Sequence, residues 1–301
     1  MNGHAPVMLT EVIAALAPRD GALYVDGTFG GGGYSRAILE AADCRVLGID
    51  RDPDAIARGQ ALIAHFGGRL SLVEGEFSRM DSYVEASDGV VLDLGVSSFQ
   101  FDQPERGFSF RADGPLDMRM SRSGMSAADF VNSADHGTLA RVLSRFGEEK
   151  NASRIARAII AARPITGTAE LARIVAEAQG PAALRHAIHP ATRTFQALRI
   201  QVNDELGELE QGLEAALRIL KPEGRLAVVS FHSLEDRIVK QFMVRQAGAT
   251  PHASRHLPQK SGSRPALKLI ARNPQTPSSM EITANPRARS AKLRVAERLA
   301  A

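Results

Sequence analysis

The sequence predicts an α/β fold in which a parallel sheet is covered by helices on both faces and interrupted by a long helical insertion. Two observations support this prediction. Short apolar runs alternate with amphipathic stretches over the first hundred or so residues, and an apolar run returns at Leu226 after a long stretch of helical spacing. Strands that alternate with helices are joined by right-handed crossovers, which place helices on both faces of a parallel sheet.

The first half of the chain contains four predicted strands, each a short apolar run that ends near a turn or an acidic residue. They are Leu23–Asp26, Val46–Asp50, Leu70–Val73 and Gly89–Leu94. Helical spacing predicts helices between them over Ser35–Ala42 and Pro53–Phe66.

Beyond Asp113–Pro115 the pattern becomes purely helical. Apolar residues recur at i, i+3, i+4 and i+7 from Leu139 to Phe146 and from Leu171 to Ala178, and Ile155–Ala162 is a further predicted helix. The same spacing runs from Phe195 to Leu213, until Lys221–Gly224 stops it. We therefore expect a sheet domain over 1–115 and 215–301 and an inserted helical domain over 116–214.

The sheet pattern resumes with a predicted strand at Leu226–Ser230 and a helix at Leu234–Phe242. Ser233 and Asp236 have the spacing of a capping box at the start of this helix. Ala266–Ile270 and Lys292–Val295 are predicted as closing strands.

Composition excludes several classes of protein. The chain has 301 residues, of which 44% are hydrophobic and 24% charged, as expected for a globular protein rather than a disordered or fibrous one. Its one cysteine, Cys44, excludes a disulfide framework and a multi-cysteine metal site, and no metal site is predicted. No apolar run approaches the roughly 18 residues of a membrane span, and no Lys or Arg precedes Arg19 as in a signal peptide. We expect a soluble, cytoplasmic protein with no membrane partner.

Charge is distributed unevenly along the chain. The net charge is +3, but 251–301 alone carries +8 and the remainder −5. A basic tail on an acidic body is typical of polyanion binding, although a solvated tail would have the same composition.

A glycine-rich stretch, Asp26–Ser35, lies between the first predicted strand and the helix that follows. Such a turn brings a ligand close to the amide groups at a helix start, and Asp50, at the end of the next strand, has the position of a ribose-binding carboxylate. No Gly-Lys-Ser/Thr follows the glycines, and a dinucleotide fingerprint starting at Gly30 would require glycine at Ser35. The pattern favours S-adenosylmethionine over NAD.

Short segments in order along nearly the whole chain carry a family resemblance. They are His4–Leu9, Asp26–Ser35, Gly48–Asp52, Asp93–Ser98, Glu105–Phe110, Gly114–Met120, Arg193–Ile200 and Ser230–Arg237. In these segments the sequence resembles the RsmH/MraW family of methyltransferases, which modify cytosine N4 in 16S ribosomal RNA of the small subunit. The resemblance implies a seven-stranded, Rossmann-like class I S-adenosylmethionine methyltransferase fold with a helical insertion that recognises the substrate. It also implies that the protein acts on the small ribosomal subunit.

The resemblance also implies a set of cofactor-binding residues. It places the cofactor against Gly32, Gly33 and Tyr34, with Asp50 on the ribose, and the remaining residues are Phe77 beside the adenine, Asp93 and Gln100. Tyr34 stands where the family's histidine is expected. This departure is harmless if the contact uses backbone atoms, and puts the contact in doubt if it uses the imidazole.

Methyl transfer to a cytosine amine needs hydrogen-bond acceptors, because the lone pair of that nitrogen is delocalised into the ring. Many amino-methyltransferases have a Pro-Pro-aromatic segment after the fourth strand, but this chain has Asp93–Val96 there. We therefore expect Asp117, Ser230 and His232 to be catalytic, although a purely structural role for His232 is equally supported.

The cysteine count bears on the reaction as well. Methylation at cytosine C5 needs a thiolate, and Cys44 precedes the second strand, at the edge opposite the ligand. This leaves an exocyclic amine or a ribose hydroxyl as the methyl acceptor.

Two groups of residues are expected to bind RNA. Gln196, Arg199 and Asn203 share one flank of a predicted helix, and Arg193 belongs to the same motif. Such a strip could instead close an ion-pair network against the sheet domain. Arg287 and Arg289 begin a basic cluster in the tail, although Lys292–Val295 could be an edge strand whose charges keep it solvated.

Two other functions remain open on the sequence. One is a non-catalytic ribosome-assembly factor with a nucleotide-binding fold, and the other is an NAD-dependent oxidoreductase, which Ser35 disfavours. The sequence does not determine the target nucleotide, or whether the protein forms a homodimer.

Overall fold

The computed structural model describes residues 6–181, 189–248 and 264–300, which form two compact units. We call residues 1–95 with 206–301 the sheet unit, and residues 96–205 the helical unit. The expected domain boundaries at 115/116 and 214/215 stay a prediction. Two features named in the sequence, His4–Ala5 of the first motif and 251–263 at the start of the basic tail, lie outside the described residues.

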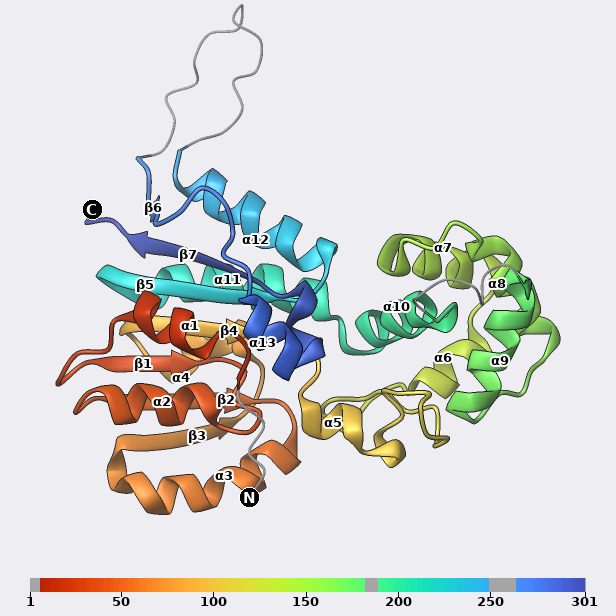
Figure 1. Cartoon of the computed structure of the whole chain (residues 1–301), viewed down its shortest axis with the longest axis horizontal. Helices are drawn as coiled ribbons and strands as arrows, with labels where there is room; N and C mark the ends of the chain where they lie inside the picture. Colours follow the sequence, from red (N-terminus) through yellow and green to blue (C-terminus); the bar gives the residue numbers. More distant parts are fainter. Residues whose placement is uncertain (1–5, 182–188, 249–263, 301) are drawn as a thin grey trace, which may run out of the picture. The chain divides into compact units, whose positions relative to one another are not determined.

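The sheet unit contains a seven-stranded sheet in the order β3-β2-β1-β4-β5-β7-β6 (Figure 1). Its strands are β1 Leu23–Asp26, β2 Arg45–Asp50, β3 Leu70–Glu74, β4 Ser87–Asp93, β5 Leu220–Ser230, β6 Leu267–Leu269 and β7 Lys292–Arg298. The seven strands expected from the resemblance are confirmed. The parallel pairing predicted for the first four strands is confirmed, and β7 runs antiparallel to both β5 and β6.

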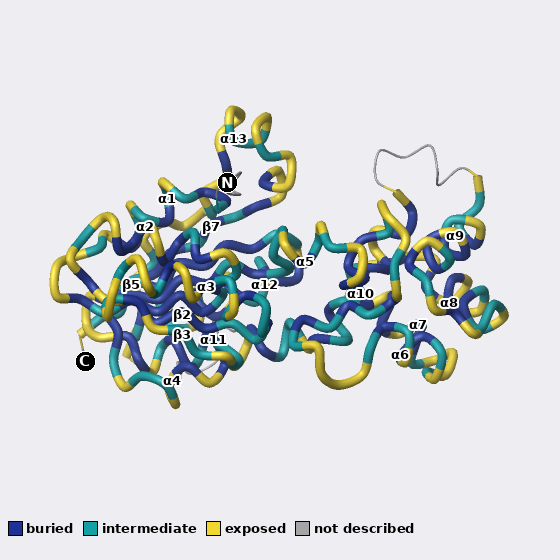
Figure 2. Tube along the Cα trace, turned by 90° about the horizontal axis from the view of Figure 1, so that it is seen from below, coloured by how far each residue is buried: buried dark blue, intermediate teal, exposed yellow. Residues whose placement is uncertain are grey.

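Alternation along the strands gives the sheet two apolar faces. Tyr24 and Val46 pack on one face, whereas Val25 and Leu47 pack on the other. Figure 2 shows the buried strands with α1 and α2 on one side and α4 and α11 on the other. The helices of this unit are α1 Leu9–Leu16, α2 Gly33–Ala41, α3 Pro53–Phe66, α4 Met80–Tyr83, α11 Glu205–Ile219, α12 Ser233–Gln246 and α13 Ser279–Ala284. The first residue of α11, Glu205, belongs to the helical unit.

The helical spacing predicted from Phe195 to Leu213 is broken in the structure. Asp204 adopts a left-handed conformation with φ 46°, which ends α10 and separates it from α11. Sequence spacing did not reveal this break, because apolar residues continue at three- and four-residue intervals on both sides of it. The predicted stop at Lys221–Gly224 is a bulge within β5, where the register with β4 shifts.

The helical unit packs around an apolar core that includes Leu116, Met118, Leu139 and Ile155, all fully buried or nearly so. Its helices are α5 Ser98–Asp102, α6 Ala127–Ser133, α7 His136–Gly147, α8 Ala152–Ala161, α9 Thr168–Gln179 and α10 Ala191–Asn203. The pattern analysis did not predict α6, which has a capping box of Ser126 and Asp129 at its start. Among the described residues, no helix is long and apolar enough to cross a membrane.

Candidate active site

The switch point of the sheet lies between β1 and β4, which are neighbours although β2 and β3 lie between them in the sequence. In open α/β sheets, ligands bind at such a point, beyond the carboxyl ends of the strands. The glycine loop (residues 26–33) leaves β1 at this edge, and Asp93 ends β4 there. The first candidate site residues are therefore brought together by the order of the strands.

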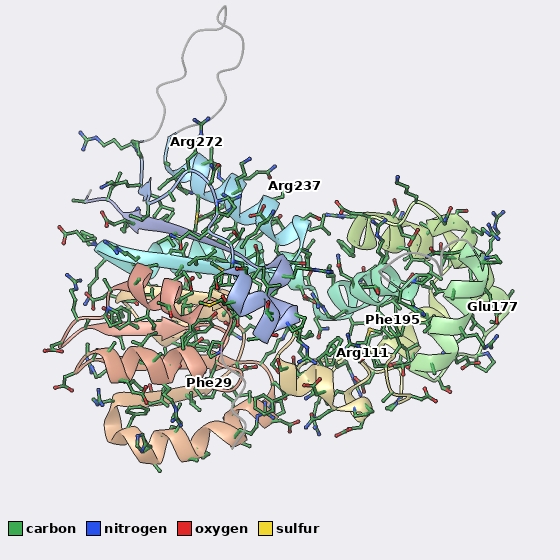
Figure 3. The ribbon with its side chains drawn as sticks, in the orientation of Figure 1. Phe29, Arg111, Glu177, Phe195, Arg237 and Arg272 are labelled. Carbon is green, nitrogen blue, oxygen red and sulfur yellow. The ribbon has the colours of Figure 1, made fainter. Side chains whose placement is uncertain are left out.

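Phe29 fixes the path of the glycine loop (Figure 3). A β-carbon at Gly32, at Gly48 in β2 or at Gly59 in α3 would lie 2.7–2.9 Å from atoms of the Phe29 ring, so the ring fills the space that these three glycines leave. Gly32 also has a positive φ of 73°, which side chains with a β-carbon rarely tolerate. The glycines thus anchor the loop as well as admitting a ligand.

A hydrogen-bonded network connects the loop to the end of β4. Ser35 Oγ donates to Asp26 at 2.7 Å, and the Thr28 amide donates to the same carboxylate at 3.3 Å. Thr28 Oγ1 in turn accepts a hydrogen bond from the Asp93 amide at 2.6 Å. Ser35, the residue that departs from the dinucleotide fingerprint, therefore holds the acid at the end of β1.

The carboxylates at this edge are buried and affect one another. Burial, together with the nearby Asp50, raises the pKa of Asp26 to about 6 in spite of its hydrogen bonds. Burial and the carboxylates of Asp26 and Glu235 raise the pKa of Asp93 well above its ordinary value. Asp93 Oδ1 is buried without a hydrogen-bond partner among the described residues, which is costly unless a ligand supplies a donor.

Asp50 lies at the end of β2, as expected. Its Oδ2 accepts the Gly30 amide at 2.7 Å, and its Oδ1 accepts the Asp52 amide at 2.8 Å. Burial raises its pKa although these amide bonds oppose the change. Each oxygen keeps a second lone pair, so the carboxylate can hold the loop and accept a hydroxyl of a ribose at once.

Gly32, Gly33 and Tyr34 lie at the start of α2, which has no side-chain cap. The first amide groups of a helix have no acceptor within it and favour a negative or polar ligand. The Tyr34 side chain is buried in the core, and its hydroxyl donates to the Val7 carbonyl. The substitution of the expected histidine therefore leaves the backbone of residue 34 for any ligand contact.

Phe77 is part of a 3-10 turn, Phe77–Arg79, and packs against the apolar face that includes Val25 and Leu47. A β-carbon at Gly212 in α11 would collide with the Phe77 ring. The Glu208 carboxylate of the same helix accepts the Ser78 amide at 2.9 Å. Phe77 thus has a structural position in the core, and its expected place near the adenine stays a prediction.

Ser230 ends β5 and His232 comes two residues later. β5 pairs with β4 there, and Val229 is the register partner of Asp93. Ser230 is buried and its hydroxyl donates to the Lys292 carbonyl at 3.4 Å. His232 Nε2 lies 3.0 Å from Glu235 Oε1, but is not aligned for a hydrogen bond.

The predicted capping box of Ser233 and Asp236 is wrong. His232 caps α12, because its Nδ1 accepts the Glu235 amide at 3.4 Å, while the buried Glu235 accepts the amides of Phe231 and His232 at 2.8 and 3.2 Å. Asp236 instead binds Lys292 and Arg294 of β7. Spacing alone could not distinguish the two possible capping boxes, because the second is the first shifted by one residue along the chain.

Asp117 and Gln100 belong to the helical unit, not to the sheet unit that contains Ser230 and His232. Arg119 binds both Asp117 oxygens, at 2.9 and 2.7 Å. Although burial acts in the opposite direction, these bonds lower the pKa of Asp117. The Gln100 side chain accepts the Ser97 amide at 3.1 Å and so closes the capping box of α5.

The predicted polar strip on α10 makes contacts within the helical unit. Arg199 forms a two-pronged ion pair with Glu205 at 2.7 and 2.8 Å, and Asn203, buried, binds the backbone of Met118 and Met120. Gln196 donates to the Phe146 carbonyl at 2.9 Å and Arg193 to that of Glu148 at 3.3 Å. These contacts all lie within the helical unit, and both the expected contact with RNA and the alternative network against the sheet domain stay predictions.

The basic tail contains a helical turn and a strand. Arg287 and Arg289 are exposed in the 3-10 turn Pro286–Ser290, on either side of the buried Ala288. The interpretation of Lys292–Val295 as an edge strand is wrong, because β7 pairs on both sides and β6 is at the edge. Lys292 and Arg294 bind Asp236 at 3.1 and 2.7 Å, so both cations share one carboxylate of the same unit.

Three residues at this edge were not assigned a role from the sequence: Asp26, Thr28 and Glu235. The signal for Asp26 was its position at the end of a strand, the same signal that identified Asp50, whereas Asp93 came from the family resemblance. Thr28 acts through the fold of its loop and Glu235 through the cap of α12, and spacing gives no indication of either.

The strand order, the antiparallel β7 and the glycine loop at the switch point define a class I methyltransferase, with S-adenosylmethionine as its cofactor. The sequence matches the MraW methylase family over residues 1–299. The chain belongs to this family.

Similar proteins are found in several bacteria. The ribosomal RNA small subunit methyltransferase H of Xanthobacter autotrophicus is 59% identical over 98% of this chain and 87% of its own. The proteins of the same name from Rhizorhabdus wittichii and Paramagnetospirillum magneticum are 57% and 56% identical over 99% of this chain and 94% and 96% of theirs. Among solved structures, an rRNA methylase from Streptococcus thermophilus aligns with 100% of this chain and 99% of its own at 12% identity, with a TM-score of 0.44.

Proposed function

We propose that the protein transfers a methyl group from S-adenosylmethionine to the N4 amine of a cytosine in 16S rRNA of the small ribosomal subunit. The observation that carries the rRNA substrate is 59% identity, over 98% of the chain, to an enzyme named for small-subunit rRNA methylation. The N4 position rests on the family resemblance and on the absence of a suitable thiolate, since Cys44 is buried directly before β2. Such a substrate places the activity in the cytoplasm.

The described residues fit the cofactor. The partnerless Asp93 Oδ1 suits an ammonium group, Asp50 suits ribose hydroxyls, and the uncapped start of α2 offers the amides of Gly33 and Tyr34. We assign cofactor binding to these residues with Gly32, Phe77 and Gln100. When bound, S-adenosylmethionine supplies a methyl group on a positively charged sulfur.

The protein's part in the reaction is to hold the amine and accept its proton. Because Asp93 is assigned to the ammonium group of the cofactor, the proton acceptor is expected among Asp117 and His232. Ser230 and His232 lie at the carboxyl end of β5, beside the strand that Asp93 ends, and we assign them to orienting the amine.

RNA binding would use the exposed Arg287 and Arg289, with Arg193, Gln196, Arg199 and Asn203 of the helical unit as further contacts. The target base would have to leave its stack, as bases do in other enzymes that modify them.

Nucleoside mass spectrometry of 16S rRNA from a deletion strain tests the proposal. We expect N4-methylcytidine to be lost, and to return when the wild-type chain is supplied but not when Asp93→Ala is supplied. An unchanged N4-methylcytidine content in the deletion strain would contradict the enzyme and favour the assembly factor. If Asp93→Ala restores growth and the ribosomal-subunit profile of the deletion strain without restoring the methylation, the protein has a separate role in ribosome assembly.

A further inference from the structure

Residues 6–8, which we call the strap, lie directly against the glycine loop. A β-carbon at Gly33 would collide with the ring of Pro6, so the strap packs on the first residue of α2. Val7 is 8% exposed and Met8 is fully buried. The strap is therefore a packed part of the loop's surroundings.

Two side chains from distant parts of the sequence hold the strap. The Tyr34 hydroxyl donates to the Val7 carbonyl, and Glu281 Oε1 accepts the Met8 amide at 2.6 Å. Burial, together with the carboxylates of Asp93, Asp26 and Glu281, raises the pKa of Tyr34 well above its ordinary value. The hydroxyl is thus kept protonated as a donor.

Glu281 replaces a missing helix cap. Met8 precedes α1 with a left-handed φ of 54° and has no side-chain cap for the helix, so a carboxylate at this position is favourable. Glu281 belongs to α13, which lies in front of the sheet in Figure 1, and its own amide is fixed by Ser278 Oγ at 3.1 Å. The carboxylate therefore reaches the strap from an ordered helix.

We propose that Tyr34 and Glu281 are positioning residues that clamp the strap onto the glycine loop and thereby slow the release of S-adenosylmethionine. The physical reason is preorganisation, because an ordered loop has less conformational freedom to lose on binding. Tyr34 has a further part in this arrangement, since it links the strap to the same turn of α2 whose amides face the ligand. The proposal rests on the cofactor site and not on the RNA substrate, so binding without RNA tests it separately.

The test uses the full chain and the variants Tyr34→Phe, Glu281→Ala and Glu281→Gln, which keeps an acceptor oxygen. Tyr24→Phe and Glu297→Ala are matched controls, because Tyr24 binds the Arg19 amide and Glu297 pairs with Arg225, both away from the glycine loop. Stopped-flow measurement gives the dissociation rate of S-adenosylmethionine, and hydrogen exchange reports on the Met8 amide.

We expect Tyr34→Phe and Glu281→Ala to release the cofactor about three- to tenfold faster, the range for one lost hydrogen bond. Exchange at Met8 should accelerate in Glu281→Ala, Glu281→Gln should recover most of both effects, and the controls should match the wild type. Faster exchange at Met8 with unchanged cofactor release would overturn the proposal, since the strap would then serve stability alone. If Glu281→Ala fails to fold, unchanged release in Tyr34→Phe overturns the proposal equally.

Discussion

Replacement of Asp26 by asparagine should change how the stability of the protein depends on pH. Asp26 is fully buried, and its pKa is raised from 3.8 to about 6. An acid whose pKa is higher in the folded state stabilises that state below its unfolded pKa, and this stability is lost as the pH rises through the folded pKa. The difference between 3.8 and about 6 corresponds to about 3 kcal/mol.

The window for this effect is therefore about pH 3 to pH 7, which brackets both pKa values of Asp26. Over this range, the unfolding free energy of the wild type should fall by about 3 kcal/mol relative to that of Asp26→Asn. Urea unfolding without cofactor, followed by far-UV circular dichroism at several pH values, measures the difference. Asparagine also disturbs the hydrogen bond from the Thr28 amide, but that loss shifts the two curves by a constant amount. Curves that stay parallel across the window would refute the reasoning.

Three further predictions concern binding and packing. Asp50→Ala should weaken S-adenosylmethionine binding by about 1–3 kcal/mol, because ribose hydroxyls lose a charged acceptor, and unchanged affinity in calorimetry would remove Asp50 from the site. Replacing Arg287 and Arg289 by glutamine should weaken binding of different RNAs similarly and flatten its salt dependence, with cofactor affinity unchanged. A salt titration with the wild-type slope would count against RNA contact there. Gly212→Ala should lower the thermal midpoint of unfolding, because the added β-carbon overpacks against Phe77 at a cost of about 1–3 kcal/mol. At an open helix site the same substitution would stabilise the protein by about 1 kcal/mol. A raised midpoint would therefore contradict the contact with Phe77.

Local pattern was sufficient to predict the strands of the sheet and the edge where the site lies. Asp26, Asp50 and Asp93 each end an apolar run, and the ends of parallel strands meet at one edge. Pattern was insufficient wherever a partner distant in the sequence decides the outcome. Asp204 breaks a helix whose apolar spacing continues, and His232 caps α12 although Ser233 and Asp236 have the usual cap spacing.

The sequence by itself determined the fold class, the glycine loop, the family and the carboxylates at the strand ends, because these depend on residue type and on spacing along the chain. The tertiary structure decided which charges are free to act and which are already paired. Arg199 binds Glu205, Asp117 binds Arg119, and β7 places Lys292 and Arg294 against Asp236. It also brought Glu281 to Met8, 273 residues away in the chain. A side chain's partner depends on which segments fold against each other, and for residues so far apart no local spacing contains that information.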